Sequence, residues 1–188
     1  MMRIIGGRAR GLHLAPVGIG DQAAHLRPTS DRVRGAIFNL LINGGYGDPL
    51  TGARVLDLFS GTGALGLEAL SRGAAKAVFV DNGDVARRLL TRNIALLRAE
   101  ADCDIIHRDA TRLGPWRGPG FEVVFLDPPY GKGLGEQALA GVLAGGWLAS
   151  DGLLVWEDSA SPLLPVGVEK LDQRKYGDTV VTILRATV

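Results

Sequence analysis

Short apolar runs alternate with helix-like stretches between residues 53 and 158, and this alternation limits the folds that the chain can adopt. Each run spans about seven residues rich in Val, Leu, Ile and Phe, as buried strands do. Helical stretches separate most of the runs, which predicts parallel strands covered on both faces. The predicted strands are 53–59, 75–81, 103–109, 121–127 and 152–158, and the predicted helices are 63–73, 84–99 and 134–146.

Both ends of the chain add elements to this core. Residues 3–17 carry three glycines between apolar positions, which predicts a β-hairpin extension. Residues 30–43 predict a helix capped by Thr29 or Ser30, with an apolar stripe from which Arg32 and Arg34 are absent. The tail after residue 167 predicts two strands that turn near 176–178. The expected fold is therefore α/β, with a mostly parallel sheet and a C-terminal antiparallel hairpin strand.

Length and composition indicate one soluble globular domain. The chain has 188 residues, of which 46% are hydrophobic and 22% are charged. No apolar run approaches the roughly 20 residues needed to cross a bilayer, and no secretion signal is recognisable. Cys103 is the only cysteine, so a disulfide framework and a cysteine-rich metal site are excluded and no metal is expected. We therefore expect a cytoplasmic protein that does not bind membranes, and a monomer, because no helix shows an obvious exposed apolar stripe.

Asp127-Pro128-Pro129-Tyr130 directly follows the predicted strand 121–127 and forms the loop at its carboxyl end. Ligands of open α/β sheets bind at this end of the strands. Two consecutive prolines stiffen the loop, because they cannot continue a helix or a central strand. A carboxylate, a rigid backbone carbonyl and an aromatic ring are thus presented together. This set suits a flat group that carries an amine, such as a nucleobase.

A glycine-rich loop follows the first predicted core strand. Residues 61–66 read GTGALG, which matches the dinucleotide-binding pattern, and Asp81 follows about 20 residues later. An NAD enzyme is therefore one alternative. Asp57 lies just before the glycines, however, where a carboxylate would repel a pyrophosphate but could accept hydrogen bonds from an ammonium group. S-adenosylmethionine carries an ammonium group, ribose hydroxyls and an adenine, and it has no phosphate.

Three aspartates at successive strand ends predict how this cofactor is held. Asp57 would face the methionine ammonium, Asp81 the two ribose hydroxyls and Asp109 the adenine amino group. The backbone of the glycine-rich loop would wrap the methionine and ribose portion. The residues predicted to bind S-adenosylmethionine, and its product S-adenosylhomocysteine, are Asp57, Phe59, Ser60, Gly61, Thr62, Gly63, Asp81, Asn82, Asp109 and Ala110.

The Asp127–Tyr130 loop resembles the [D/N]PP[Y/F] motif of class I S-adenosylmethionine-dependent methyltransferases, and this resemblance implies methylation of an exocyclic amino group. An exocyclic aryl amine is a poor nucleophile because its lone pair is delocalised into the ring. The Asp127 carboxylate and the Pro128 carbonyl could accept hydrogen bonds from its two N–H groups and aim the lone pair at the methyl group. Tyr130 would stack on the base, which must be unpaired or flipped out. The predicted catalytic residues are Asp127, Pro128, Pro129 and Tyr130.

Positive charge is concentrated at the start of the chain. Residues 1–34 carry a net charge of +4, whereas the remainder carries −3. Arginines grip phosphates without reading the base sequence, so this segment predicts a nucleic-acid contact. The residues predicted to bind RNA are Arg3, Arg8, Arg10, Arg27, Thr29, Arg32 and Arg34.

Five segments resemble the bacterial methyltransferase family that modifies a guanine N2 in 16S ribosomal RNA. They are RIIGGRARG (3–11), LRPTSDRVRGAIFNLL (26–41), LDLFSGTGALGLEALSRGA (56–74), FLDPPY (125–130) and RKYGDT (174–179). The resemblance covers essentially the whole chain. It implies a Rossmann-like class I methyltransferase with a seven-stranded sheet, and the 30S ribosomal subunit or an assembly form of it as substrate. It also matches Asp127 and Tyr130 to the family's catalytic loop.

The domain prediction follows from the same comparison. Residues 1–188 are expected to form a single methyltransferase domain, in which 1–28 is a basic extension for RNA and 29–188 is the catalytic core. Two alternatives remain besides the NAD enzyme. The DPPY loop also fits a DNA adenine-N6 methyltransferase, although the chain lacks room for a separate target-recognition domain. A non-catalytic RNA-binding assembly factor would carry the same basic arm.

Overall fold

The structure is a computed structural model that describes residues 2–16 and 30–187, and a seven-stranded sheet forms its centre. The strand order is β3-β2-β1-β4-β5-β7-β6. Strands β1 to β5 run parallel to one another, and β7 is antiparallel to both β5 and β6. The strands are β1 Arg54–Leu58, β2 Lys76–Asp81, β3 Cys103–His107, β4 Phe121–Leu126, β5 Leu148–Asp158, β6 Val168–Tyr176 and β7 Thr179–Ala186.

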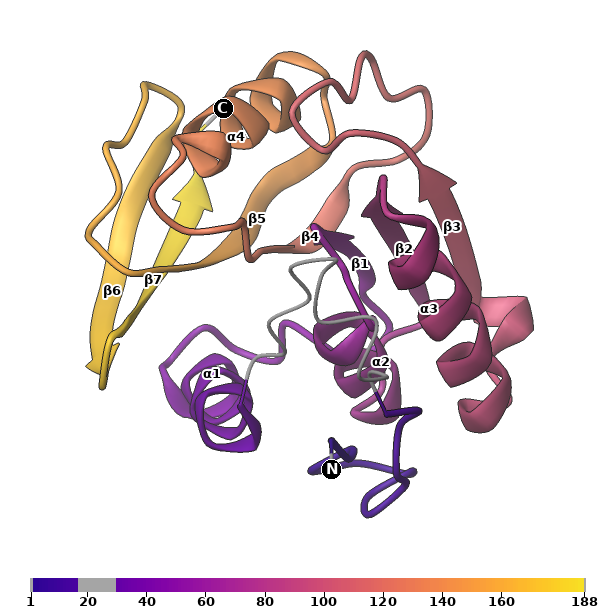
Figure 1. The fold of residues 1–188 in the computed structure, drawn as a ribbon. Helices are drawn as coiled ribbons and strands as arrows, with labels where there is room; N and C mark the ends of the chain where they lie inside the picture. Colours follow the sequence, from indigo (N-terminus) through magenta and orange to yellow (C-terminus); the bar gives the residue numbers. More distant parts are fainter. Residues whose placement is uncertain (1, 17–29, 188) are drawn as a thin grey trace.

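Helices cover both faces of this sheet (Figure 1). Successive strand residues point to opposite faces, so Val55 of β1 packs with the first helix while its neighbour Leu56 packs with the last one. None of the helices in the described ranges is long and apolar enough to span a bilayer. The helices are α1 Asp31–Asn43, α2 Ala64–Ser71, α3 Asp84–Leu97 and α4 Leu134–Ala144, with a short 3-10 turn η2 at Glu100–Asp102.

The direction of strand addition reverses at β1. From β1 the chain adds β2 and then β3 on one side, and it later returns to place β4 on the other side. The chain therefore leaves β1 and β4 in opposite directions, and this switch point, here called the crevice, is the usual ligand position in open α/β sheets. In register, Leu58 of β1 lies beside Leu126 of β4. The glycine-rich loop and the DPPY loop thus begin at the same level of the sheet.

Strand β7 lies between β5 and β6, although it follows β6 in the chain. The turn between β6 and β7 includes Gly177, whose φ of 64° is accessible to glycine at little cost. The parallel strands, the antiparallel C-terminal hairpin and their turn are confirmed as predicted. Strand β5 begins at Leu148, earlier than the predicted 152, and its pairing with β4 shifts register between Phe121 and Val123.

Residues 2–16, here called the N-terminal arm, turn back on themselves less regularly than predicted. One antiparallel bridge pairs Arg3 with His13, and the Ile4 and Leu14 N–H groups donate to the Leu12 and Met2 carbonyls, both at 2.9 Å. The arm therefore forms a single-bridge hairpin instead of two strands. Ile4 and Leu14 are buried in the cluster that joins α2, α3 and β2. Because it shares this core, the arm is packed into the fold.

Candidate functional site

The loop after β1 adopts a tight, left-handed backbone at three of its five residues. Phe59, Gly61 and Gly63 have φ values of 56°, 53° and 79°. Glycine adopts these angles freely, whereas a left-handed conformation costs a side-chain-bearing residue about 1–2 kcal/mol. Phe59 offsets this cost by packing its ring against the core on the α4 side of the sheet. The loop is thus held in a tight turn between β1 and α2.

Ser60 carries a buried hydroxyl at the start of the glycine-rich loop. Its side chain is buried, and its Oγ has no hydrogen-bond partner within residues 2–16 and 30–187. The Ser60 N–H donates to the Val80 carbonyl at 3.2 Å, and its own carbonyl accepts from the Gly63 N–H at 2.7 Å. Buried hydroxyls without a partner cost free energy, so they mark positions where a ligand completes the structure.

Asp57 lies inside β1 and is almost completely buried. Its Oδ2 accepts from the Gly66 N–H of α2 at 2.9 Å. Burial raises the pKa of this carboxyl to about 8, and the Gly66 hydrogen bond opposes that rise without cancelling it. A cation placed beside Asp57 would therefore be favoured strongly, because it would restore the charged form of a carboxylate already removed from water.

Gly66 allows α2 to approach β2 closely. A Cβ at residue 66 would lie 2.9 Å from Cζ of Phe79, closer still to Cε1 of the same ring, and 3.2 Å from the Asp57 Oδ2. Phe79 is fully buried, so its ring cannot move aside easily. The third glycine of the GTGALG pattern therefore has a packing role, which the spacing alone could not distinguish from a ligand role.

This packing gives a direct stability prediction. Gly66→Ala is expected to lower the free energy of unfolding by about 1–3 kcal/mol, as overpacking of a core typically does. Gly141→Ala is the matched control, because Gly141 also lies within a helix and no atom of residues 2–16 or 30–187 approaches its Cβ position within 4 Å. The control should gain about 0.4–1 kcal/mol from the reduced freedom of the unfolded chain. Urea unfolding of both variants measures the two effects, and equal shifts would contradict the assigned packing role.

Asp81, at the end of β2, holds two loops together. Its Oδ2 accepts from the Gly61 N–H at 2.8 Å, and its Oδ1 accepts from the Gly83 N–H at 2.8 Å. Each carboxylate oxygen can accept a second hydrogen bond, so both remain able to bind a hydroxyl pair. Neighbouring Asn82 is exposed, and its carbonyl contacts His107 Nε2 at 2.9 Å. The β1 loop and the β2 end thus form one connected surface.

Asp109 follows β3 and starts a turn. Its Oδ1 accepts from the Thr111 N–H at 2.8 Å and from the Thr111 hydroxyl at 2.7 Å, and these hydrogen bonds lower the pKa of the carboxyl. Ala110 is buried against the core on the α4 side. Asp57, Asp81 and Asp109 therefore stand at or near the carboxyl ends of three adjacent strands, as predicted. Their contacts with a cofactor stay a prediction.

The DPPY loop leaves β4 on the other side of the crevice. Pro128 is buried, Asp127 and Tyr130 are half-buried, and Pro129 is exposed. The Tyr130 hydroxyl donates to Glu157 Oε1 of β5 at 2.9 Å and lies 3.4 Å from Thr179 Oγ1 of β7. The phenol thereby anchors the loop to two further strands. The sequence predicts only a stacking role for Tyr130 and no role for Glu157.

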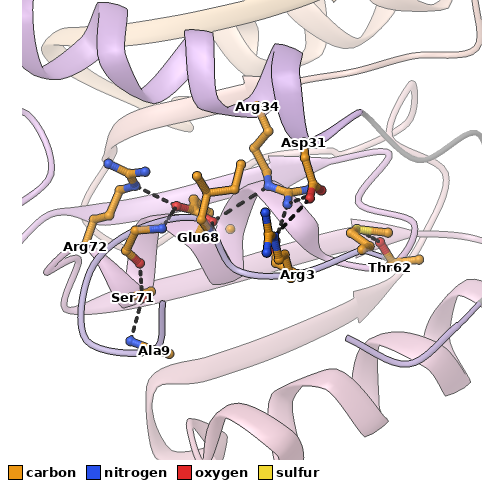
Figure 2. Close-up of polar contacts among 12 residues, drawn as sticks. Arg3, Ala9, Asp31, Arg34, Thr62, Glu68, Ser71 and Arg72 are labelled. Atoms are coloured by element: carbon orange, nitrogen blue, oxygen red, sulfur yellow. Dashed lines mark hydrogen bonds and ion pairs between the residues drawn. The ribbon is translucent and has the colours of Figure 1, made fainter. Parts of the chain in front are cut away.

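A buried ionic cluster changes the role of one predicted RNA contact. The Arg34 side chain is fully buried, where its guanidinium donates to the Arg3 carbonyl and to Asp31 Oδ1, the latter at 2.9 Å. Its Nε lies 3.7 Å from Glu68 Oε2 of α2. Figure 2 shows Arg34 and Arg72 on either side of Glu68. The prediction that Arg34 contacts RNA is therefore wrong for this structure, because a phosphate cannot reach the buried guanidinium.

Glu68 connects the N-terminal arm to this cluster. Its two carboxylate oxygens accept from the backbone N–H groups of Ile5 and Gly6, both at 2.8 Å, and Oε1 also accepts from Arg72 Nε at 2.7 Å. Glu68 is fully buried, and it is not among the residues predicted from the sequence. A signal existed, because this glutamate falls in the middle of the otherwise apolar helix ALGLEALS. The carboxylate thus ties the arm to α2.

The remaining predicted RNA contacts are divided by their surroundings. Arg10 and Arg32 are exposed. Arg3 lies 3.6 Å from Asp31 and Arg8 lies 3.9 Å from Asp102, and these long ion pairs leave both arginines well exposed. Arg27 and Thr29 lie outside the described residues. The arm and the start of α1 therefore present Arg3, Arg8, Arg10 and Arg32 as accessible cations.

Comparisons with known proteins agree with this arrangement. The family model described as conserved hypothetical protein 95 matches residues 2–185. Ribosomal RNA small subunit methyltransferase D of Escherichia coli K12 is 38% identical over 87% of this chain and 78% of its own length. The enzyme of the same name from Haemophilus influenzae is 34% identical over 87% of this chain and 82% of its own length.

Solved structures extend the likeness to the whole fold. Escherichia coli yhhF, described as a candidate methyltransferase, superposes with a TM-score of 0.82 at 34% identity and covers 98% of this chain and 97% of its own. A hypothetical protein of Thermus thermophilus has a TM-score of 0.74 at 32% identity, covering 97% and 98%. The chain therefore belongs to the family described as conserved hypothetical protein 95, in which its relatives include the ribosomal RNA small subunit methyltransferases D.

Proposed function

We propose that this protein transfers the methyl group of S-adenosylmethionine to the exocyclic N2 of a guanine in 16S ribosomal RNA, within the 30S subunit or an assembly form of it. The observation that carries the proposal is the crevice at the strand reversal, where the glycine-rich loop and the DPPY loop begin at the same level of β1 and β4. Relatives named as ribosomal RNA small subunit methyltransferases support the reaction and the polymer.

The residues on the β1 side of the crevice fit the cofactor. The Ser60 hydroxyl has no partner among the described residues, and Phe59, Gly61 and Gly63 adopt left-handed angles, so this loop leaves polar groups for a ligand that approaches the main chain closely. Asp57 would bind the ammonium group, Asp81 the ribose hydroxyls, and Asp109 the adenine amino group, with Asn82 and Ala110 flanking the ring. When bound, S-adenosylmethionine supplies an electrophilic methyl group on a sulfonium sulfur.

The DPPY loop then prepares the nucleophile. The Asp127 carboxylate and the Pro128 carbonyl each accept a hydrogen bond from one N–H group of the guanine amine. This turns the nitrogen lone pair toward the methyl group. The same two acceptors stabilise the positive charge that grows on the nitrogen during transfer. The carboxylate can also accept the proton that the methylated nitrogen releases. Tyr130 supports the base by stacking.

The accessible arginines would place the protein on its polymer. Arg3, Arg8, Arg10 and Arg32 suit phosphates, because a guanidinium binds them bidentately without reading the base. We propose residues 2–16 and the start of α1 as the RNA-contacting surface of a single domain whose remainder forms the catalytic core. The choice of nucleotide would then come from ribosomal architecture.

Transfer of a tritiated methyl group tests the proposed function. Purified protein is incubated with 30S particles, with naked 16S RNA and with genomic DNA, and the products are digested to nucleosides for mass spectrometry. We expect N2-methylguanosine from the ribosomal substrate. Methyladenine from DNA would instead support the adenine-N6 alternative. Absence of both S-adenosylmethionine binding and transfer would support a non-catalytic assembly factor.

The raised pKa of Asp57 predicts proton release on cofactor binding. Burial holds the pKa near 8 in the ligand-free protein, so the carboxyl is largely protonated at pH 7. A bound ammonium group favours the carboxylate and lowers this pKa, so affinity should rise as pH increases toward 8 and level off above it. Calorimetry at pH 7 in buffers of different ionisation enthalpy should detect up to one released proton. Asp57→Asn should remove the release, and a proton count that the variant leaves unchanged would contradict the assignment.

A further inference from the structure

Glu157 occupies a central position beside the DPPY loop. It is the penultimate residue of β5, and its strand neighbour Trp156 lies beside Leu126, the last residue of β4. Glu157 and Asp127 therefore follow the paired residues at the same edge of the sheet. The Glu157 side chain is buried, although a carboxylate is costly to remove from water unless it is hydrogen-bonded. Such a residue requires a reason beyond packing.

The contacts of Glu157 point to the DPPY loop. Its Oε1 accepts from the Tyr130 hydroxyl at 2.9 Å, and the same hydroxyl lies 3.4 Å from Thr179 Oγ1. Thr179 is the first residue of β7, so the phenol tip lies where β5, β7 and the DPPY loop meet. A hydrogen bond to a charged acceptor is about twice as strong as a neutral one. Glu157 thus holds the hydroxyl end of the Tyr130 ring, and the two prolines before Tyr130 restrict the backbone at its other end.

The phenol is suited to remain a donor. Burial, with a further contribution from the negative charge of Glu157, raises the pKa of Tyr130 above its ordinary value. The hydroxyl therefore stays protonated at neutral pH and keeps donating to the carboxylate. A ring fixed at both ends has one orientation, and a stacking platform needs one orientation to place a base reproducibly.

We propose that Glu157 is a positioning residue for methyl transfer, which sets the orientation of Tyr130 and, through it, of the loop that carries Asp127. This inference rests on the proposed function, because it assigns a purpose to the loop that binds the base. Glu157 does not touch the reacting atoms in this scheme. Its contribution reaches the amine through the Tyr130 ring, so loss of either partner should have the same consequence.

A double-mutant cycle tests this coupling. Glu157→Ala and Tyr130→Phe should each lower kcat by about 10- to 100-fold, the scale of a misplacement near 1 Å. The double variant should be no slower than the worse single variant, because both substitutions remove one shared interaction. Glu157→Gln retains an acceptor oxygen without the charge and should lose only about three- to tenfold. Losses that multiply in the double variant would overturn the proposal.

Two controls separate positioning from general damage. Asp158→Asn changes the adjacent carboxylate, whose Oδ1 bonds only the neighbouring Ser159 among the described residues, and should retain wild-type kcat. S-adenosylmethionine affinity, measured on every variant, should stay within about threefold, because the residues proposed to hold the cofactor lie on β1, β2 and the segment after β3, and Tyr130 follows β4. A Glu157→Ala variant that lost cofactor affinity and kept its kcat would show a merely structural role and overturn the inference.

A substrate-free measurement distinguishes failure of this inference from failure of the proposed function. The chain has three tyrosines, so the ring signals of labelled Tyr130 can be assigned by substitution and followed by NMR. Glu157→Ala should shift and broaden the Tyr130 signals, whereas Asp158→Asn should leave them unchanged. If these shifts appear and the wild type methylates no RNA, the proposed function fails and the coupling stands. If the signals do not respond, the coupling itself is wrong.

Discussion

Asp127→Ala should lower the rate of methyl transfer by about 100- to 1,000-fold while S-adenosylmethionine affinity changes little. The loss has this size because the carboxylate supports charge that develops only in the transition state, and removing one such contact typically costs this much. Affinity survives because the proposed cofactor residues lie on β1, β2 and the segment after β3, across the crevice from the DPPY loop. Single-turnover transfer to 30S particles and calorimetric titration measure the two quantities.

Asp127→Asn is the matched control for this prediction. The asparagine keeps a carbonyl oxygen that can accept a hydrogen bond from one N–H group of the amine, but it loses the negative charge. A hydrogen bond to a neutral acceptor is about half as strong, so we expect a loss of about tenfold, well short of the alanine variant. A fully active Asp127→Ala enzyme would remove Asp127 from the mechanism. Equal loss of rate and of cofactor affinity would show instead that the loop shapes the cofactor site.

Arg34→Met should destabilise the fold by about 3 kcal/mol. Breaking a buried ion pair from one side costs about 3–5 kcal/mol, because the remaining charge stays buried without its partner. The lower end applies here, since Glu68 keeps Arg72 and the two backbone N–H groups of the arm. Methionine fills a similar length with an apolar chain, so the cavity contribution is small. Urea unfolding followed by circular dichroism measures the change.

Arg32→Met is the matched control two residues away in α1. Arg32 is exposed, so its loss should change the free energy of unfolding by less than about 0.5 kcal/mol. Arg34→Met should therefore lower the free energy of unfolding more than Arg32→Met does, and Arg32→Met should weaken RNA binding more than Arg34→Met does. Arg32→Met should weaken RNA binding and reduce its salt dependence by about one ion, whereas folded Arg34→Met should bind RNA almost normally. Weaker binding by a stably folded Arg34→Met protein would restore the original prediction for Arg34.

Much of the fold could be predicted because its signals are local. Apolar runs of strand length alternate with helical spacing, and handedness rules then leave few topologies. The three aspartates could be predicted for the same reason, since each stands at or beside the end of an apolar run. The N-terminal arm was less predictable. Its apparent strands pair through one bridge, because the N–H groups of Ile5, Gly6 and Ala9 donate to the Glu68 and Ser71 side chains of α2 instead of to a partner strand.

Arg34 shows what the local sequence cannot predict. Arg34 was placed off the apolar stripe of α1, yet Arg34, Ile37, Phe38 and Leu41 are all buried and follow helical spacing. A charge on such a stripe requires a buried partner, and that partner lies 34 positions away in a different helix. Glu157 was missed for a similar reason, because its hydrogen bond to Tyr130 joins residues 27 positions apart. Pairings at this range follow from the tertiary fold.

The position of β7 has a consequence for how the chain folds. Because β7 enters between β5 and β6, the almost wholly apolar run 152–156 of β5 has an open edge until β7 has been added. An exposed apolar edge is a template for pairing with another molecule. During synthesis this edge would persist until the β7 residues emerge. A protein truncated within β7 should therefore aggregate instead of merely losing stability, because the edge of β5 would stay uncovered.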